Sequence, residues 1–269
     1  MTTHRTIAEL AAALDPLRLG SEIGLVPTMG ALHVGHRALV EAARSECDAV
    51  VASIFVNPAQ FGPREDFERY PRDEAQDARL AAEWGVDHLF VPPFEELYPQ
   101  GFQTWVEVEG LSGALEGAAR PGHFRAVATV CLKLFNIARP RRAYFGQKDA
   151  QQAAVVERAV RDLNLSLEIR VVPTVRDEDG LALSSRNAYL SAEERQAALA
   201  LPRALAAGAE AHRHGEEAAP AARSVLAEEP LLDPDYVEVA RLNGRKYLLA
   251  AVRAGGTRLI DNVVLEGET

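Results

Sequence analysis

Two histidines three residues apart are the first side chains of this sequence whose types and spacing suggest chemistry. His33 and His36 lie in VPTMGALHVGH (26–36), directly after the apolar run EIGLV. On a helix, residues at i and i+3 share a face, so both imidazoles can donate to one phosphate. Gly30 and Gly35 let a ligand approach the backbone closely. The segment is a candidate nucleotide-binding turn, with a helix beginning near His33 or Val34 whose N-terminal N–H groups would face an anion.

Three simpler interpretations compete with nucleotide binding: packing in a core, capping of a helix start, and binding of a metal. A metal pair is the weakest, because no third His, Cys or carboxylate lies at a suggestive local spacing. The segment matches neither the GxGxxG dinucleotide loop nor the GxxxxGK[ST] phosphate loop.

Other polar groups follow predicted strands. The Gln60 amide in FVNPAQF suits a small hydroxy acid, although a turn-capping amide has the same features. GQKD (146–149) places a lysine beside a helix start, where the helix dipole already favours an anion; the alternative is a solvated lysine. LSSR (183–186) is by itself also typical of a surface turn.

The elements that must position these groups alternate along the first two thirds of the chain. Strands are predicted at 22–27, 49–57, 88–93, 143–146 and 167–175, and helices at 38–47, 73–85, 126–138 and 149–163. Strands separated by helices of this length indicate right-handed crossovers and a mainly parallel sheet covered on both faces. We therefore expect an α/β, Rossmann-like doubly wound fold, in which ligands bind beyond the carboxyl ends of the strands.

The pattern changes after Val175. Ala-rich helices are predicted from Ser191 to about Glu228, and three short strands at 236–242, 246–252 and 257–265. The sequence thus predicts a Rossmann-like domain at 1–175 and a smaller α+β domain at 176–269 that carries the LSSR loop and closes over the site.

Composition narrows the class of protein. The 269 residues are 48% hydrophobic and 25% charged, with a formal net charge of −10, which argues against a general nucleic-acid binder. Two distant cysteines suit a reducing compartment. No signal peptide and no apolar run of membrane-spanning length is evident, so we expect a cytoplasmic protein without a membrane partner.

The histidine motif is also the HxGH signature of a superfamily that activates carboxylates or phosphates with ATP. The blocks PTMGALHVGH, FVNPAQF, RYPRD, RPGHFRAVATV, AYFGQKDAQQ, DGLALSSRN and RLIDN resemble the pantothenate synthetase family in order and spacing across almost the whole chain. The resemblance implies ATP-dependent condensation of (R)-pantoate with β-alanine, through a pantoyl-adenylate, to pantothenate, AMP and pyrophosphate. It also implies Mg²⁺ as cofactor and a homodimer.

The resemblance implies roles for individual residues. Catalysis is expected of His36, His33, Lys148 and Arg186, with His36 as proton donor or charge stabiliser. Gln60 and Gln152 are expected to bind pantoate or β-alanine, and Asp77 to bind the metal. The residues expected to contact ATP are Met29, Gly30, Ala31, Leu32, His33, Val34, Gly35, His36, Gly146, Gln147, Lys148, Asp149, Val175, Leu183, Ser184, Ser185 and Arg186.

Three positions depart from the family pattern. Ala59 stands where Met is usual, Gln76 precedes Asp77 where some members have two acids, and Ala126 replaces a glycine in RPGHFRA. His123 and Arg125 of that block are site residues or helix-start packing, and neither is assigned a role.

Other functions remain open from the residues alone. A nucleotidyltransferase of the same fold would need the histidine motif but neither FVNPAQF nor Gln152. A tRNA synthetase is disfavoured by the short, acidic chain. A noncatalytic nucleotide sensor would not need both the histidines and the SSR loop, and a purely structural protein would not need polar residues at so many strand ends.

Overall fold

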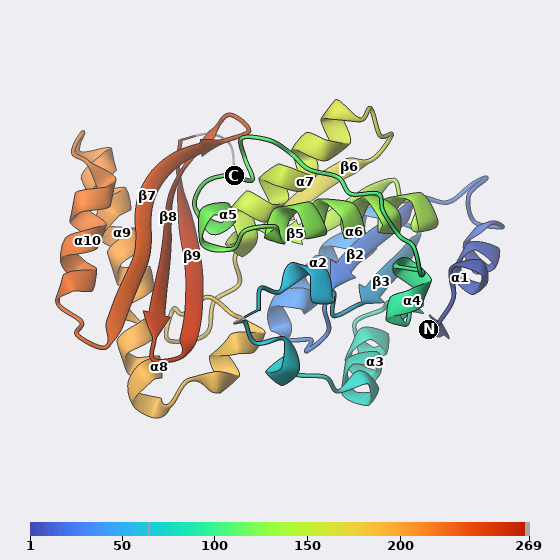
Figure 1. Ribbon diagram of the computed structural model, residues 1–269, viewed down its shortest axis with the longest axis horizontal. Coiled ribbons are helices and arrows are strands. Elements are labelled where there is room, and N and C mark those ends of the chain that lie inside the picture. Colours follow the sequence, from blue (N-terminus) through green and yellow to red (C-terminus); the bar gives the residue numbers. More distant parts are fainter. Residues whose placement is uncertain (64, 267–269) are drawn as a thin grey trace. The chain divides into compact units, whose positions relative to one another are not determined.

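The computed structural model describes residues 1–63 and 65–266. The chain divides into two compact units, one formed by residues 1–146 and 151–172 and the other by residues 147–150 and those from 173 onward (Figure 1). The predicted division at 175/176 and the closing of the second domain over the site stay predictions. Within the described residues, no helix combines the length and the apolar character needed to cross a membrane.

The first unit is built on a six-stranded sheet with the order β1-β4-β3-β2-β5-β6, in which all paired strands are parallel. The strands are β1 (Thr2–His4), β2 (Ile23–Thr28), β3 (Ala49–Ile54), β4 (His88–Phe90), β5 (Arg142–Gly146) and β6 (Glu168–Val172). This confirms the predicted doubly wound α/β fold, with β1 as a strand that the sequence pattern did not predict.

Helices cover both faces of this sheet. They are α1 (Ile7–Leu14), α2 (Val34–Glu46), α3 (Glu74–Glu83), α4 (Phe94–Leu97), α5 (Glu116–Ala119), α6 (His123–Ala138) and α7 (Ala150–Asp162). Successive strand residues point to opposite faces: Leu25 packs in a core with α1, α6 and α7, and Val26 in a core with α2 and α3. Because both faces are buried at the centre of the sheet, β2 and β3 are largely apolar, whereas the outer strand β6 contains Glu168 and Arg170.

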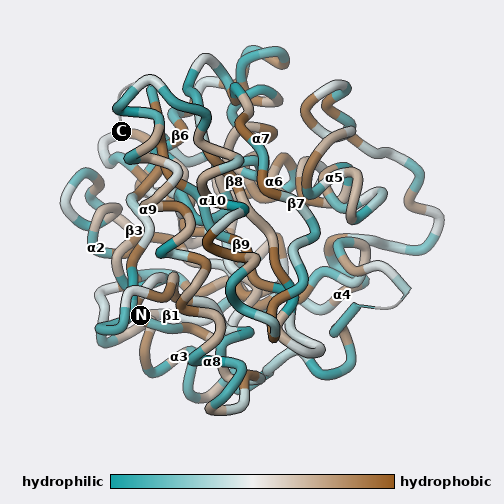
Figure 2. The backbone as a smooth tube through the Cα atoms, turned by 90° about the vertical axis from the view of Figure 1, so that its left-hand side faces the viewer, coloured by the Kyte–Doolittle hydropathy of each residue, from teal (hydrophilic) through white to brown (hydrophobic). Residues whose placement is uncertain are grey.

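The second unit packs helices against an antiparallel sheet. Strands β7 (Leu232–Leu242), β8 (Arg245–Ala254) and β9 (Thr257–Glu266) pair in sequence order, and hydrophobic residues dominate β8 (Figure 2). The helices are α8 (Ala192–Ala198), α9 (Ala200–Arg213) and α10 (Ala218–Ala227). Gly208 allows α9 to pack closely against β8, because a Cβ at this position would lie 2.3 Å from Leu248 Cδ2.

Candidate active site

The strand order of the first unit identifies the carboxyl ends of its central strands as the place for a ligand. The chain runs from β2 to β3 and β4 on one side, and β5 and β6 lie on the other side. The order therefore reverses between β2 and β5, and a crevice forms at such a point outside the carboxyl ends of the strands. The turn at 29–33 begins directly after Thr28, the last residue of β2.

The turn after β2 is held in an uncommon backbone conformation. Gly30 and Ala31 both have positive φ, +79° and +50°. The Thr28 hydroxyl donates to the carbonyl of Ser53 on β3 (2.7 Å) and accepts from the Gly30 N–H (3.1 Å). The turn is thereby attached to the neighbouring strand at its start.

The two histidines cap the helix that follows. His33 is the N-cap of α2, and its Nδ1 accepts from the Gly35 N–H at 3.1 Å; His36 Nδ1 accepts from the His33 N–H at 3.2 Å. The ring centroids are 4.1 Å apart. Because each Nδ1 accepts a hydrogen bond, the neutral rings carry their hydrogen on Nε2. Capping and ligand binding are thus compatible roles, since capping uses Nδ1 whereas a ligand would accept from Nε2–H.

The backbone of the turn offers fewer donors than the sequence led us to expect. The amides of Gly30, Ala31, Leu32, His33 and Gly35 all donate to other groups of the protein. An anion at this turn would therefore depend on the imidazole donors more than on these N–H groups. That N–H groups at the start of this helix face an anion stays a prediction.

Gln60 is held by its own surroundings. It ends the 3₁₀ turn Pro58–Gln60, is 7% exposed, and its Oε1 accepts from Asn57 Nδ2 at 3.2 Å. Its backbone carbonyl accepts from His123 Nδ1 (2.9 Å) and from Arg120 Nη2 (3.2 Å). Asn57, which the sequence did not single out, thus orients the side-chain amide of Gln60, whereas His123 and Arg120 hold its backbone.

The same contacts assign His123 a role that the sequence left open. Arg120 donates to His123 Nε2 (3.1 Å) and forms a bidentate ion pair with Glu65, at 2.6 and 2.9 Å. Burial, assisted by the positive charge of Arg120, lowers the pKa of His123 to about 4. His123 is therefore neutral near pH 7, with its hydrogen on Nδ1 directed at the Gln60 carbonyl. RPGHFRA was the only signal of this cluster in the sequence.

Two adjacent glutamines on α7 have different surroundings. Gln151 is 3% exposed; its Nε2 donates to the carbonyls of Leu111 (2.7 Å) and Ala114 (2.8 Å), and its Oε1 accepts from the Glu116 N–H (3.0 Å). Gln151 therefore supports the loop at 111–116. Gln152, the predicted ligand residue, is half-buried.

In the second unit, Asn262 of β9 supports the predicted lysine. Its Nδ2 donates to the carbonyls of Gln147 (2.8 Å) and Lys148 (2.9 Å), and Lys148 Nζ lies 3.2 Å from Asp149 Oδ1. Asn262 is buried and comes from the RLIDN block, to which no role had been assigned. A buried side-chain amide thus helps to hold the backbone at Lys148.

The predicted loop at 183–186 begins at a short backbone pairing. The Leu183 N–H donates to the Val175 carbonyl at 3.0 Å, and the Ser184 hydroxyl accepts from the Arg186 N–H at 3.3 Å as the N-cap of a 3₁₀ turn. Val175 and the LSSR loop are therefore brought together.

Asp77, the predicted metal ligand, has other partners. It is 3% exposed, and its two oxygens accept from the Ala31 N–H (2.8 Å) and the Leu32 N–H (2.7 Å). In the part of the chain that the structure describes, no three His, Cys, Asp or Glu side chains gather to hold a metal ion. The residues present therefore do not fit a cation held by the protein alone.

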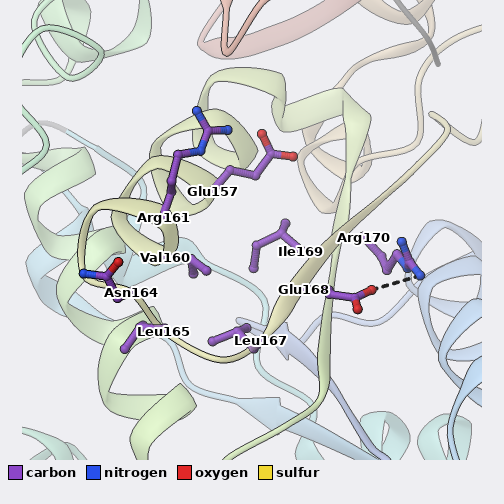
Figure 3. Close-up of a pocket in the computed structure, with 9 residues that line it drawn as sticks. All are labelled: Glu157, Val160, Arg161, Asn164, Leu165, Leu167, Glu168, Ile169 and Arg170. Carbon is purple, nitrogen blue, oxygen red and sulfur yellow. Dashed lines mark ion pairs between the residues drawn. The ribbon is translucent and has the colours of Figure 1, made fainter.

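A pocket elsewhere in the first unit is formed by α7 and β6 and contains none of the predicted site residues (Figure 3). Leu165, Leu167 and Ile169 contribute apolar surface, and an ion pair joins Glu168 and Arg170 at 3.1 Å. The pocket therefore lies outside the candidate site.

Similarity to known proteins extends along almost the whole chain. The family model described as pantoate-beta-alanine ligase matches residues 2–264. Proteins named pantothenate synthetase are 56% identical in Chloroflexus aurantiacus (100% of this chain, 99% of the relative) and 53% identical in Acidobacterium capsulatum (100% and 98%).

Solved structures agree in fold as well. Pantothenate synthetase from Thermus thermophilus superimposes with a TM-score of 0.94 at 50% identity, covering 99% of this chain and 100% of that one. The pantoate-beta-alanine ligase of Francisella tularensis, solved with a β,γ-ATP compound and β-alanine, has a TM-score of 0.85 at 35% identity and covers 100% and 99%. By sequence and by fold, this chain belongs to the pantoate–β-alanine ligase family.

Proposed function

We propose that this protein catalyses the ATP-dependent condensation of (R)-pantoate with β-alanine to pantothenate, AMP and pyrophosphate. The observation that carries the proposal is the histidine-capped turn after β2, at the point where the strand order reverses, in a chain that matches the family over residues 2–264. A nucleotidyltransferase acting on a phosphorylated substrate would have no use for the oriented Gln60 amide.

The reaction takes two steps. A carboxylate oxygen of pantoate attacks the α-phosphorus of ATP, a new C–O–P bond forms, and pyrophosphate leaves. The neutral amine of β-alanine then attacks the acyl carbon, loses a proton, and AMP departs with the carboxylate oxygen. Enclosure matters between these steps, because water would hydrolyse the mixed anhydride.

The residues of the turn would act on the first step. Charge builds up on the phosphate oxygens as the C–O–P bond forms, and preorganised donors stabilise it. We assign the Nε2–H groups of His33 and His36 to this work, since their Nδ1 atoms already accept backbone hydrogen bonds. Gln60 and Gln152 are assigned to pantoate or β-alanine. Lys148, Ser184, Ser185 and Arg186 are assigned to ATP on the basis of the resemblance, with Lys148 and Arg186 as additional positive charge.

Mg²⁺ is proposed to enter with ATP and to offset part of the phosphate charge. ATP oxygens and water supply most ligands of such an ion, so it does not need a cluster of protein ligands.

We also propose that the protein is a cytoplasmic homodimer. In support of the dimer, the sheet has two edge strands among the described residues, β1 and β6, and an edge strand can pair with a second chain. Light scattering tests the dimer, and cell fractionation the location.

An isotope experiment tests the reaction. With pantoate labelled with ¹⁸O in its carboxylate, AMP should gain one ¹⁸O only when both pantoate and β-alanine are present. Replacement His36→Ala should reduce turnover about 10²- to 10³-fold, the usual loss for one such donor. The matched control is His214→Ala, since His214 is exposed at the end of α9. AMP without ¹⁸O, or AMP formed without pantoate, would refute the acyl-adenylate.

A further inference from the structure

We propose that Asp77 is a positioning residue: its carboxylate holds the turn at 29–33 in the conformation that starts α2 at His33. This inference rests on the proposed function, because it assigns to that turn the binding of phosphate. It differs from the role of metal ligand that the resemblance implied for the same residue.

Asp77 joins the turn at 29–33 to α3 through two hydrogen bonds, and we call this pair of contacts the clamp. Asp77 lies on α3, and its two oxygens accept from two consecutive N–H groups of the turn, those of Ala31 and Leu32, at 2.8 and 2.7 Å. The side chain is almost fully buried. Hydrogen bonds to a carboxylate are short and strong compared with neutral ones, so these two bonds couple the turn firmly to a helix more than 40 residues away in sequence.

The turn needs such a clamp because its backbone is unfavourable. Ala31 has φ +50°, a region that residues other than glycine rarely adopt. Gly30, at φ +79°, packs directly against the clamp, since a Cβ there would lie 2.8 Å from Asp77 Oδ2 and 3.0 Å from Ile54 Cγ2. A conformation of this kind persists where surrounding contacts over-determine it, which is common in active sites.

Geometry also explains why a carboxylate is required. Both N–H groups point at position 77, so this side chain must supply two acceptors. An asparagine supplies one acceptor, and its NH₂ group would face the second N–H. Asp77→Asn should therefore break one of the two hydrogen bonds. The turn could then leave its conformation, which would displace the two histidines at the start of α2.

The first measurement uses the protein without nucleotide or metal. We expect Asp77→Asn to increase amide hydrogen exchange at Ala31 and Leu32 at least about tenfold, the change that corresponds to a loss of ~1.4 kcal/mol of local stability. The matched control is Asp73→Asn on the same helix, where asparagine is an equally good N-cap. Unchanged exchange at both amides in Asp77→Asn would overturn the proposal.

The second measurement separates a clamp from a metal ligand. A displaced turn should lower kcat/KM about 10²-fold, as misplacement of catalytic groups does, and raising Mg²⁺ should not recover it. Adding Ala31→Gly should restore part of the activity of Asp77→Asn, because glycine adopts positive φ without help. Full recovery at high Mg²⁺, with no benefit from Ala31→Gly, would identify Asp77 as a metal ligand and overturn the proposal.

Two further outcomes are informative. If Asp77→Asn does not fold, recovery of folding by Ala31→Gly supports the clamp, and a double variant no more stable than the single one contradicts it. If the wild-type protein forms no AMP from pantoate and ATP, the proposed function fails, whereas the exchange measurement still decides the role of Asp77 in the turn.

Discussion

Acidification should destabilise this protein through His123. The pKa of His123 is lowered from 6.5 to about 4, chiefly by burial and also by the charge of Arg120, against the opposing effects of the Gln60 carbonyl, Glu65 and Glu116. A histidine whose pKa is lower in the folded state stabilises the fold above its unfolded pKa. That contribution is lost as the pH falls from about 6.5 towards 4.

The magnitude follows from the two pKa values. A fall from 6.5 to about 4, at about 1.4 kcal/mol for each pH unit, gives roughly 3 kcal/mol. This is a large part of the stability of an ordinary domain, which is about 5–15 kcal/mol. His4 and His88, in contact at 3.0 Å, also have pKa values lowered by burial, so the protein as a whole should lose more than His123 alone contributes.

Urea denaturation between pH 7 and pH 4 isolates the contribution of His123. In His123→Asn the amide keeps a donor for the Gln60 carbonyl but does not titrate in this range. The free energy of unfolding of the wild type should fall by roughly 3 kcal/mol more than that of the variant. The exposed His214→Asn serves as control and should follow the wild type. A difference between wild type and His123→Asn that does not change with pH would refute the reasoning.

Two further predictions concern the second unit. Asn262→Ala removes the donor for two backbone carbonyls and should lower the free energy of unfolding by about 2 kcal/mol in urea denaturation. It should also lower kcat/KM in the AMP assay, because Lys148 loses its support; an unchanged kcat/KM would separate Asn262 from the site. Gly208→Ala brings a methyl group against Leu248 and should cost about 1–3 kcal/mol, measured as a lower Tm. At Gly20 an added Cβ meets nothing within 4 Å, so Gly20→Ala should leave Tm nearly unchanged, and equal effects at both positions would contradict the packing argument.

Most of the first unit's sheet follows from the hydrophobic pattern, but β1 does not. The apolar runs at 22–27 and 49–57 correspond to β2 (Ile23–Thr28) and β3 (Ala49–Ile54). By contrast, β1 is three residues long, begins with two threonines, and pairs with β4, more than 80 residues away. A short strand that is stabilised by pairing with a distant segment need not show a periodic pattern of hydrophobic residues in its own sequence.

Local signals also predicted the start of α2. The interval between His33 and His36 equals that between the N-cap and N3 positions, and their mutual capping needs no distant residue. The partners of the other site residues are far away in sequence: Asp77 contacts the turn 45 and 46 residues before it, and His123 contacts the Gln60 carbonyl 63 residues before it. No motif indicates that a carboxylate on α3 faces two amides after β2.

The sequence by itself determined the α/β class, the two histidines at a helix start and the family resemblance, because these depend on local spacing and on the order of motifs. Only the tertiary structure decided which amides Asp77 accepts from, which carbonyl His123 donates to, and that Asn262 supports Lys148. Each of those contacts joins residues far apart in the sequence, which become neighbours only when the chain folds. The sequence alone indicated a metal ligand at Asp77, and the two amides that face this carboxylate in the fold are the observation from which the clamp is proposed.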